Sequence, residues 1–149
     1  MITIEYCTKE DTEELFILFG EWDNTYVFDR GVFVDSMNRI LDERSNILLL
    51  AKEDGKIVGY VQMYPCNELG FEPFFEVAEF LVAGEKRNRG IGKLLMKEAE
   101  GIALSEKIRI IKLSSQAHRT KAHVFYENMG YEYYKISKFY EKKLMKETE

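Results

Sequence analysis

Residues 77–93 read VAEFLVAGEKRNRGIGK, and this stretch is the most informative one for predicting the fold. The apolar run that ends at Ala83 is typical of a buried strand. A short basic turn follows it, and Gly90 and Gly92 then open a run whose apolar residues recur at helical spacing. The stretch therefore predicts a strand that leads through a glycine-containing basic turn into an amphipathic helix.

The predicted turn has the composition of an anion-binding site. A helix N-terminus exposes unpaired N–H groups and a partial positive charge, and glycine lets a backbone approach a ligand closely. Lys86, Arg87, Arg89 and Lys93 add positive charge there, in a chain whose net charge is −5. These features together predict a phosphate cradle. Spacing alone leaves one alternative open, an ordinary helix start whose charges are solvated.

Two common nucleotide-binding motifs are absent from this turn. A Walker loop needs a glycine where Arg87 stands, and a serine or threonine where Leu94 follows Lys93. A dinucleotide fingerprint needs a third glycine where Leu95 stands. The phosphate ligand is therefore expected to belong to another class.

The rest of the chain predicts a mixed α/β fold in one domain over residues 1–149. Asp54-Gly55 lies between two apolar runs and is a strong hairpin signal. The strand–helix–strand unit that follows is expected to be parallel and right-handed. The expected strands span residues 1–6, 47–52, 57–63, 74–83, 108–113, 131–136 and 139–144, with a loose polar segment over 64–72. Four helices are expected. The first includes the apolar residues from Leu15 to Trp22, the second includes those from Phe33 to Leu41, and the other two span residues 90–104 and 121–129.

Local patterns add predictions about three of these helices. Thr8 and Asp11 both offer capping oxygens before the first helix, and Glu14 stands three residues after Asp11, the spacing of a capping box. Gly130 is well placed to end the last helix. The helix over 90–104 is expected to turn an apolar face inward, formed by Ile91, Leu94, Leu95, Ala99 and Ile102.

Composition excludes several classes of protein. The chain has 149 residues, 46% of them apolar, which is enough for a real core. Its two cysteines are far apart and its two histidines are few, so we expect neither a disulfide scaffold nor a metal site. An acidic chain suits nucleic acid poorly. No apolar stretch approaches the ~20 residues of a membrane span, and residues 1–6 lack a signal-peptide core. We therefore expect a cytoplasmic protein that binds neither nucleic acid nor membrane.

Two motifs resemble those of the GNAT superfamily of acetyl-CoA-dependent N-acetyltransferases. Arg87-x-x-Gly90-x-Gly92 resembles the superfamily's R/Q-x-x-G-x-G/A signature, and AHVFYENMGY over 122–131 resembles its A-x-x-F-Y-E-x-x-G-F/Y segment. The run from Leu113 to Tyr126 is similar to the branch of aminoglycoside 6′-N-acetyltransferases and aminoalkylphosphonate N-acetyltransferases. The resemblance implies the GNAT fold, a mixed central sheet with splayed parallel strands flanked by about four helices.

The resemblance also implies how acetyl-CoA is bound. The pyrophosphate is expected on the backbone N–H groups of the turn, with Arg87 and Arg89 beside it. The pantetheine arm is expected along the strand, where one N–H group polarises the thioester carbonyl. Arg119 stands where many relatives carry a cofactor-contacting asparagine, so it is a further candidate. The backbone candidates are Phe80, Leu81 and Val82 for the arm, and Asn88, Arg89, Gly90, Ile91, Gly92 and Lys93 for the pyrophosphate.

Two residues are the candidates for proton transfer in a direct attack of an amine on the thioester. Tyr126 matches the family position of the acid that protonates the departing sulfur; on spacing alone it would be a core residue. Glu79 is the candidate base, because a carboxylate is unexpected on a buried strand. Strand alternation places Glu79 on the same side as Val77 and Leu81. Glu76, on the opposite face, is the alternative base.

The expected substrate is a small molecule that carries a primary amine. The 21–29 loop combines aromatic rings with acidic residues, and this combination suits an ammonium group. Trp22, Asp23, Asp29 and Glu76 are the candidate substrate contacts; an ordinary surface loop is the alternative. A peptide N-terminus or lysine, a longer acyl group, or a regulatory module that binds acyl-CoA without turnover also stay open. A homodimer is a further possibility.

Overall fold

A computed structural model describes residues 1–23 and 25–145. The chain forms two compact units, Met1–Ser114 and Ser115–Glu149. The first contains the sheet and most of the helices, and the second contains one helix and the C-terminal segment. The expectation of one domain over the whole chain stays a prediction.

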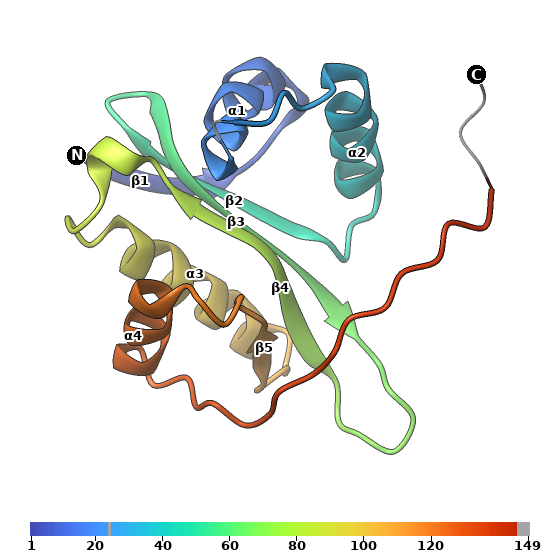
Figure 1. Cartoon of the computed structure of the whole chain (residues 1–149). Helices are drawn as coiled ribbons and strands as arrows, with labels where there is room; N and C mark the ends of the chain where they lie inside the picture. Colours follow the sequence, from blue (N-terminus) through green and yellow to red (C-terminus); the bar gives the residue numbers. More distant parts are fainter. Residues whose placement is uncertain (24, 146–149) are drawn as a thin grey trace. The chain divides into compact units, whose positions relative to one another are not determined.

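The first unit is built on one five-stranded sheet in which the strands lie in sequence order, as Figure 1 shows. Successive strands are antiparallel from β1 to β4, and β5 runs parallel to β4. Asp54 and Gly55 have φ values of 51° and 84° at the β2–β3 turn, which confirms the predicted hairpin. The strands are β1 (Ile2–Tyr6), β2 (Ile47–Glu53), β3 (Lys56–Cys66), β4 (Phe74–Val82) and β5 (Ile111–Leu113).

Helices cover both faces of this sheet. α1 (Thr12–Phe19) and α2 (Arg30–Asp42) lie over one face, and α3 (Ile91–Ser105) lies over the other (Figure 1). Short 3-10 turns precede α1, follow it and precede α3. The first helix therefore ends before Trp22, which lies in the turn Gly20–Trp22. No helix in the described part of the chain is long and apolar enough to cross a membrane.

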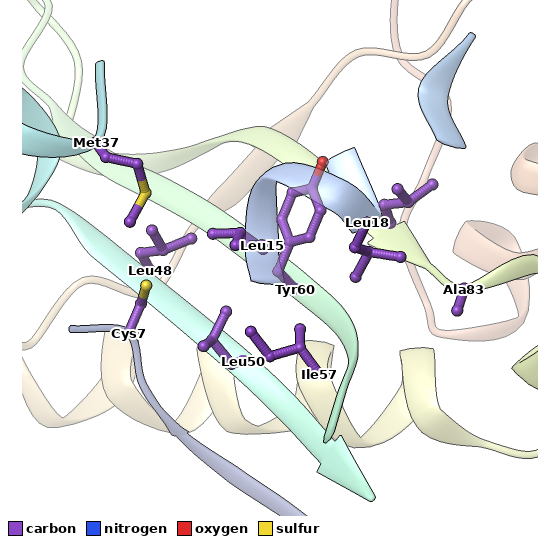
Figure 2. Packing of buried hydrophobic residues seen from close by; sticks show 10 residues of the cluster. Cys7, Leu15, Leu18, Met37, Leu48, Leu50, Ile57, Tyr60 and Ala83 are labelled. Atoms are coloured by element: carbon purple, nitrogen blue, oxygen red, sulfur yellow. The ribbon is translucent and has the colours of Figure 1, made fainter. Parts of the chain in front are cut away.

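The face under α1 and α2 holds a buried cluster centred on Tyr60 of β3. Figure 2 shows the Tyr60 ring between Leu15 and Leu18 of α1, with its hydroxyl directed away from the strand that carries it. Met37 of α2 is buried, and Phe33, Ile40 and Leu41 are partly buried, as helical periodicity predicted. The packing of α1 and α2 on this face therefore follows from apolar spacing.

The opposite face packs against α3. Gly59 of β3 permits close contact, because a Cβ there would lie 3.1 Å from the Leu95 side chain and 3.1 Å from the Leu81 carbonyl oxygen. The predicted inward face was wrong at Leu94, which is 47% exposed. Met96 and Ala103 are buried instead. The buried stripe is therefore rotated relative to the prediction, toward the positions that face the sheet.

Three local predictions, one capping box and two strand boundaries, were wrong. The capping box joins Thr8 and Asp11, with Thr8 N–H donating to Asp11 Oδ2 at 2.9 Å, and not Asp11 and Glu14. Glu14 instead accepts the Ile57 N–H at 2.7 Å. Ile108 N–H donates to the Ala103 carbonyl in a C-cap of α3, so the next strand begins later than residue 108. β3 also continues to Cys66, into the segment expected to be loose.

The second unit contains α4 (Thr120–Asn128). Gly130 has a φ of 93° just after this helix, as predicted for its end. The strands predicted over 131–136 and 139–144 were wrong, because the described residues there form no strand. Alternation of apolar and polar residues is not enough for a strand, whose backbone groups must also pair with a neighbouring strand.

Candidate functional site

The turn between β4 and α3 presents an open helix N-terminus. Asn88 and Gly90 have φ values of 65° and 83°, and α3 begins at Ile91 directly after them. Within the described residues no side chain caps this helix. The first N–H groups of a helix have no intrahelical acceptor. They are therefore available to an anion, as the phosphate-cradle prediction requires.

The basic side chains of this turn are held by local contacts. Glu53, at the end of β2, accepts Lys86 Nζ at 2.8 Å and Arg89 Nη2 at 2.6 Å. These two cations lower the pKa of Glu53 to about 2. Arg87 Nε donates to the Val82 carbonyl oxygen at 3.1 Å, so the Arg87 guanidinium group lies against the end of β4. Lys93 is exposed on the first turn of α3.

Two acidic residues that contact this turn were missed by the sequence analysis. Glu53 is one, and Glu21 is the other, since Glu21 Oε1 accepts the Gly84 N–H at 2.8 Å. Glu21 comes from the short turn after α1, far from the basic turn in sequence. Their positions depend on the order of the strands and helices, which periodicity does not specify.

The strand before the turn runs past its parallel neighbour. The β4–β5 ladder ends at the pair Val77–Leu113, whereas β4 continues to Val82. The part of β4 beyond Val77 therefore has no β5 partner in the described ladder, and the splaying of the parallel strands that the resemblance implied stays a prediction. The Leu81 side chain is buried in the core, and Phe80 and Val82 are partly buried. Leu81 is thus limited to backbone contacts with a ligand.

A β-bulge on β4 sets the direction of Glu79. Glu79 lies opposite Gln62 of β3, but Val77 lies opposite Met63, so Ala78 is the extra residue. Residues directly opposite each other project from the same face. Glu79 therefore shares the α1/α2 face with Gln62, and Val77 projects from the other. The prediction that Glu79 and Val77 lie on one side was wrong, because a bulge shifts the alternation by one residue.

The same register corrects the position of Glu76. Glu76 lies opposite Tyr64, two residues along β3 from Gln62. Since alternate residues of a strand share a face, Glu76 and Glu79 lie on the same face and not on opposite faces as predicted.

Glu79 is half-buried beside two aromatic side chains. Trp22 Nε1 donates to the Tyr60 hydroxyl at 2.6 Å. Burial raises the pKa of Glu79, and a hydrogen bond from the Trp22 side chain opposes this effect. Burial also raises the pKa of Tyr60, with a smaller contribution from Glu79. The result is a carboxyl group that holds a proton more readily than an exposed glutamate does.

Glu79 lines a cavity of about 410 Å³ between α1, α2 and β3. Its aromatic lining consists of Phe19, Tyr26, Phe28, Phe33 and Tyr60. Its polar lining consists of Asp29, Ser36, Gln62 and Glu79. The volume and the mixture of a largely apolar wall with a few polar groups are typical of small-molecule sites.

The other candidate substrate residues lie in different surroundings. Asp29 lines the cavity, and its Oδ1 accepts the Val32 N–H at 3.0 Å as the N-cap of α2. Trp22 contacts the cavity indirectly, because its indole N–H donates to the hydroxyl of Tyr60, which lines the cavity. Asp23 is exposed and accepts from the backbone and hydroxyl of Thr25. Asp23 and Glu76 are not among the described lining residues, and their contact with substrate stays a prediction.

Tyr126 and Arg119 belong to the second unit. Both are half-buried, and Arg119 is the N-cap residue of α4. Burial raises the pKa of Tyr126, and the Arg119 charge partly opposes this. The hydroxyl is therefore protonated at neutral pH and can donate a proton. His123 Nε2 lies 2.9 Å from the Gln116 carbonyl oxygen in the same unit.

The described residues contain no cluster of histidine, cysteine and carboxylate side chains that could hold a metal ion.

Comparisons with known proteins agree with this geometry. The family model described as "Acetyltransferase (GNAT) family" matches residues 5–131. The uncharacterized N-acetyltransferase YhfO of Bacillus subtilis (strain 168) is 27% identical over 93 residues, which span 62% of each chain and so less than two thirds of that relative. The aminoalkylphosphonate N-acetyltransferase of Salmonella typhimurium is 27% identical over 86% of this chain and 83% of its own.

A solved structure gives the same result for the fold. AAC(6′)-Iy, an aminoglycoside N-acetyltransferase, is described in complex with CoA and with a bisubstrate analogue of CoA and acetylneamine. The bisubstrate complex superposes with a TM-score of 0.84 and 18% identity, over 96% of this chain and 99% of its own. Together with the cradle at the start of α3 and the strand that outruns its neighbour, the family match shows that the chain belongs to the GNAT family of acetyltransferases.

Proposed function

We propose that this protein transfers an acetyl group from acetyl-CoA to a primary amine of a small cationic molecule. One observation carries the proposal. Strand β4 bears Glu79, which lines an aromatic cavity together with one other carboxylate, Asp29, and the same strand leads into the open N-terminus of α3. An amine site and a diphosphate site are thus joined by one strand. The names of the Salmonella relative and of AAC(6′)-Iy, both amine acetyltransferases, support it.

The turn fits the diphosphate of acetyl-CoA. Backbone N–H groups over 88–93 would donate hydrogen bonds to its oxygens, and Gly90 has open space where a side chain would project. Arg87 and Arg89 add charge, and the second unit contributes Arg119 as a further candidate. The backbone of β4 from Phe80 to Val82 would pair with the pantetheine arm. When bound, acetyl-CoA supplies an activated acetyl thioester.

Glu79 and Tyr126 are proposed to move the two protons of the reaction. A cationic amine must lose a proton before its nitrogen can bond to the acetyl carbon, and the Glu79 carboxylate accepts that proton. Once the nitrogen has bonded to the acetyl carbon it must lose a second proton, and the departing sulfur needs one. The Tyr126 hydroxyl donates its proton to the sulfur and regains one from the nitrogen. Both groups have a raised pKa, which suits a base near neutral pH and an acid that stays protonated.

The proposal is tested first by cofactor binding. Thermal unfolding is measured with and without acetyl-CoA, for the native protein and for Gly90→Glu. Gly90→Ala is the matched control, because it carries the same left-handed strain of about 1–2 kcal/mol without a charge. We expect a concentration-dependent stabilisation of the native protein, retained in Gly90→Ala and lost in Gly90→Glu. No stabilisation of the native protein would contradict the proposal.

Free-thiol release with a panel of amines then separates turnover from regulatory binding. Amine-dependent release supports an enzyme for small amines. Release only with peptides would indicate a peptide N-terminus or lysine as acceptor. Binding of acetyl-CoA without release, across the whole panel, would favour the regulatory module.

A further inference from the structure

The aromatic side chains of the cavity form one continuous wall. Tyr26 and Phe28 have ring centroids 4.7 Å apart, and Phe28 and Phe19 are also 4.7 Å apart. Phe33 continues the series at 5.2 Å from Phe19. Such a wall stabilises an apolar or aromatic body, and the faces of its rings attract a cation.

The charged side chains among the described residues that line the cavity are all acidic. Asp29 lies at an exposed position and Glu79 at a half-buried one. Ser36 already donates its hydroxyl to the Phe33 carbonyl oxygen at 2.7 Å, which leaves Gln62 and the hydroxyls of Tyr26 and Tyr60 as neutral polar groups. Among the described residues that line the cavity, none is lysine, arginine or histidine. A positive group is therefore favoured there, and a negative group has no cationic partner.

We infer that the acceptor is a primary amine with a compact aromatic or aliphatic body, a single positive charge and no anionic group. The inference rests on the proposed function in taking the cavity's ligand to be the acceptor. Its ammonium group would face Glu79 and Asp29, and its apolar body would lie against the wall from Tyr26 to Phe33.

This chemistry separates three kinds of amine. An aminophosphonate brings a doubly charged anion into a cavity whose described lining has two carboxylates and no cation, and such a like-charge contact is unfavourable. An aminoglycoside brings many hydroxyl groups, and burying a hydroxyl without a hydrogen bond is costly. A phenylalkylamine matches both the wall and the charge. The predicted order of binding is therefore phenylalkylamine first, with the other two well behind.

Trp22 provides a direct probe of this cavity. It is the single tryptophan of the chain, and its indole N–H donates to the hydroxyl of Tyr60, which lines the cavity. Intrinsic fluorescence therefore reports occupancy without any turnover. The probes are 2-phenylethylamine, 2-aminoethylphosphonate, neamine and the uncharged isostere 2-phenylethanol, each titrated with and without saturating CoA.

Two variants change the charge of the cavity while the fold is kept. Asp29→Asn removes a charge but keeps an N-cap residue of similar strength, and Val32→Lys adds a cation at a lining position that is 64% exposed. Each is expected to raise the Kd for 2-phenylethylamine by about 2- to 5-fold. Asp35→Asn, an exposed charge on α2 outside the cavity lining, is the matched control and should leave this Kd unchanged.

The outcomes separate this inference from the proposed function. Saturable binding of 2-phenylethylamine that is weakened in both variants and tighter than that of the other three probes supports it. Equal or tighter binding of the phosphonate or of neamine overturns it, even if one of them is acetylated. Absence of any 2-phenylethylamine response, with and without CoA, also overturns it. Binding in the predicted order without acetyl transfer to any amine leaves the cavity's selectivity supported and contradicts the proposed function.

Discussion

Glu79 lies directly opposite Gln62 across the β4–β3 pair, one step out of register with the pair Val77–Met63. The extra residue, Ala78, turns the Glu79 carboxyl group to the face that carries the aromatic cavity. Without the bulge, Glu79 would share the side of Val77, against α3. One inserted residue therefore decides whether this carboxylate is a candidate base, and β-bulges often occur next to active sites for this reason.

The first prediction concerns the activity of Glu79→Gln. The amide keeps the shape of the side chain but cannot accept a proton, so kcat/KM for amine acetylation should fall by about 10²- to 10⁴-fold. In the native protein, kcat/KM should rise with pH through a pKa above the usual glutamate value of 4.5, and this step should be absent in the variant. An unchanged pH profile would show that Glu79 does not accept the proton.

The second prediction concerns the stability of the same variant. Because burial raises the pKa of Glu79 in the folded protein, the stability that this carboxyl contributes is present below its unfolded pKa and is lost as pH rises through its folded pKa. Glu79→Gln should therefore melt at a higher temperature than the native protein at pH 8. The difference should vanish near pH 4. A variant that melts lower at pH 8 would contradict this reasoning.

The third prediction concerns Glu53, whose carboxylate neutralises Lys86 and Arg89 in the basic turn. Glu53→Gln removes a negative charge next to the proposed diphosphate site, so the Kd for acetyl-CoA should fall several-fold, and less so at high salt. Glu106→Gln, at the other end of α3, makes the same change in net charge and should have no effect. Weaker binding in Glu53→Gln would show that the ion pairs position the turn instead.

The fourth prediction compares two glycines. A methyl group at Gly59 would press on Leu95 and on the Leu81 carbonyl at 3.1 Å, so Gly59→Ala should destabilise the protein by about 1–3 kcal/mol. Gly101 lies inside α3 with open space around it, so Gly101→Ala should stabilise by about 0.5–1 kcal/mol. Urea unfolding measures both. Equal effects of the two substitutions would contradict the close packing of α3 on β3.

The fifth prediction concerns the two thiols. Burial raises the pKa of Cys7 to about 12 and also raises that of Cys66, which is only half-buried. A thiol reagent at pH 8 should therefore modify Cys66 slowly in the native protein and should reach Cys7 only after unfolding. Mass spectrometry of the intact chain measures the modification. Fast modification of both Cys7 and Cys66 in the native protein would contradict the burial and the raised pKa of these thiols.

Much of the fold follows from local patterns. Asp54-Gly55 specifies its hairpin, and the spacing of Leu15, Leu18 and Met37 places α1 and α2 on the sheet. The glycine turn before α3 and the motif around Tyr126 are equally local, and they were sufficient to indicate the family. These features depend on residues close together in sequence.

The features that the sequence did not reveal depend on distant residues. The bulge at Ala78 depends on how β3 pairs with β4, so alternation grouped Glu79 correctly with Leu81 but wrongly with Val77, and it placed Glu76 on the wrong face. Glu21 and Glu53 reach the basic turn only because the fold brings three elements together. The strands predicted after Gly130 were wrong, since no local pattern guarantees a partner for a ladder.

Acetylation of an amine by this chain is tested by direct detection of the product. The purified protein is incubated with acetyl-CoA and 2-phenylethylamine, and mass spectrometry follows the amine while a thiol reagent follows free CoA. We expect N-acetylated amine and free thiol in equal amounts, both strongly reduced in Glu79→Gln. Acetyl-CoA that binds but yields no acetylated product with this or any other amine would contradict this expectation.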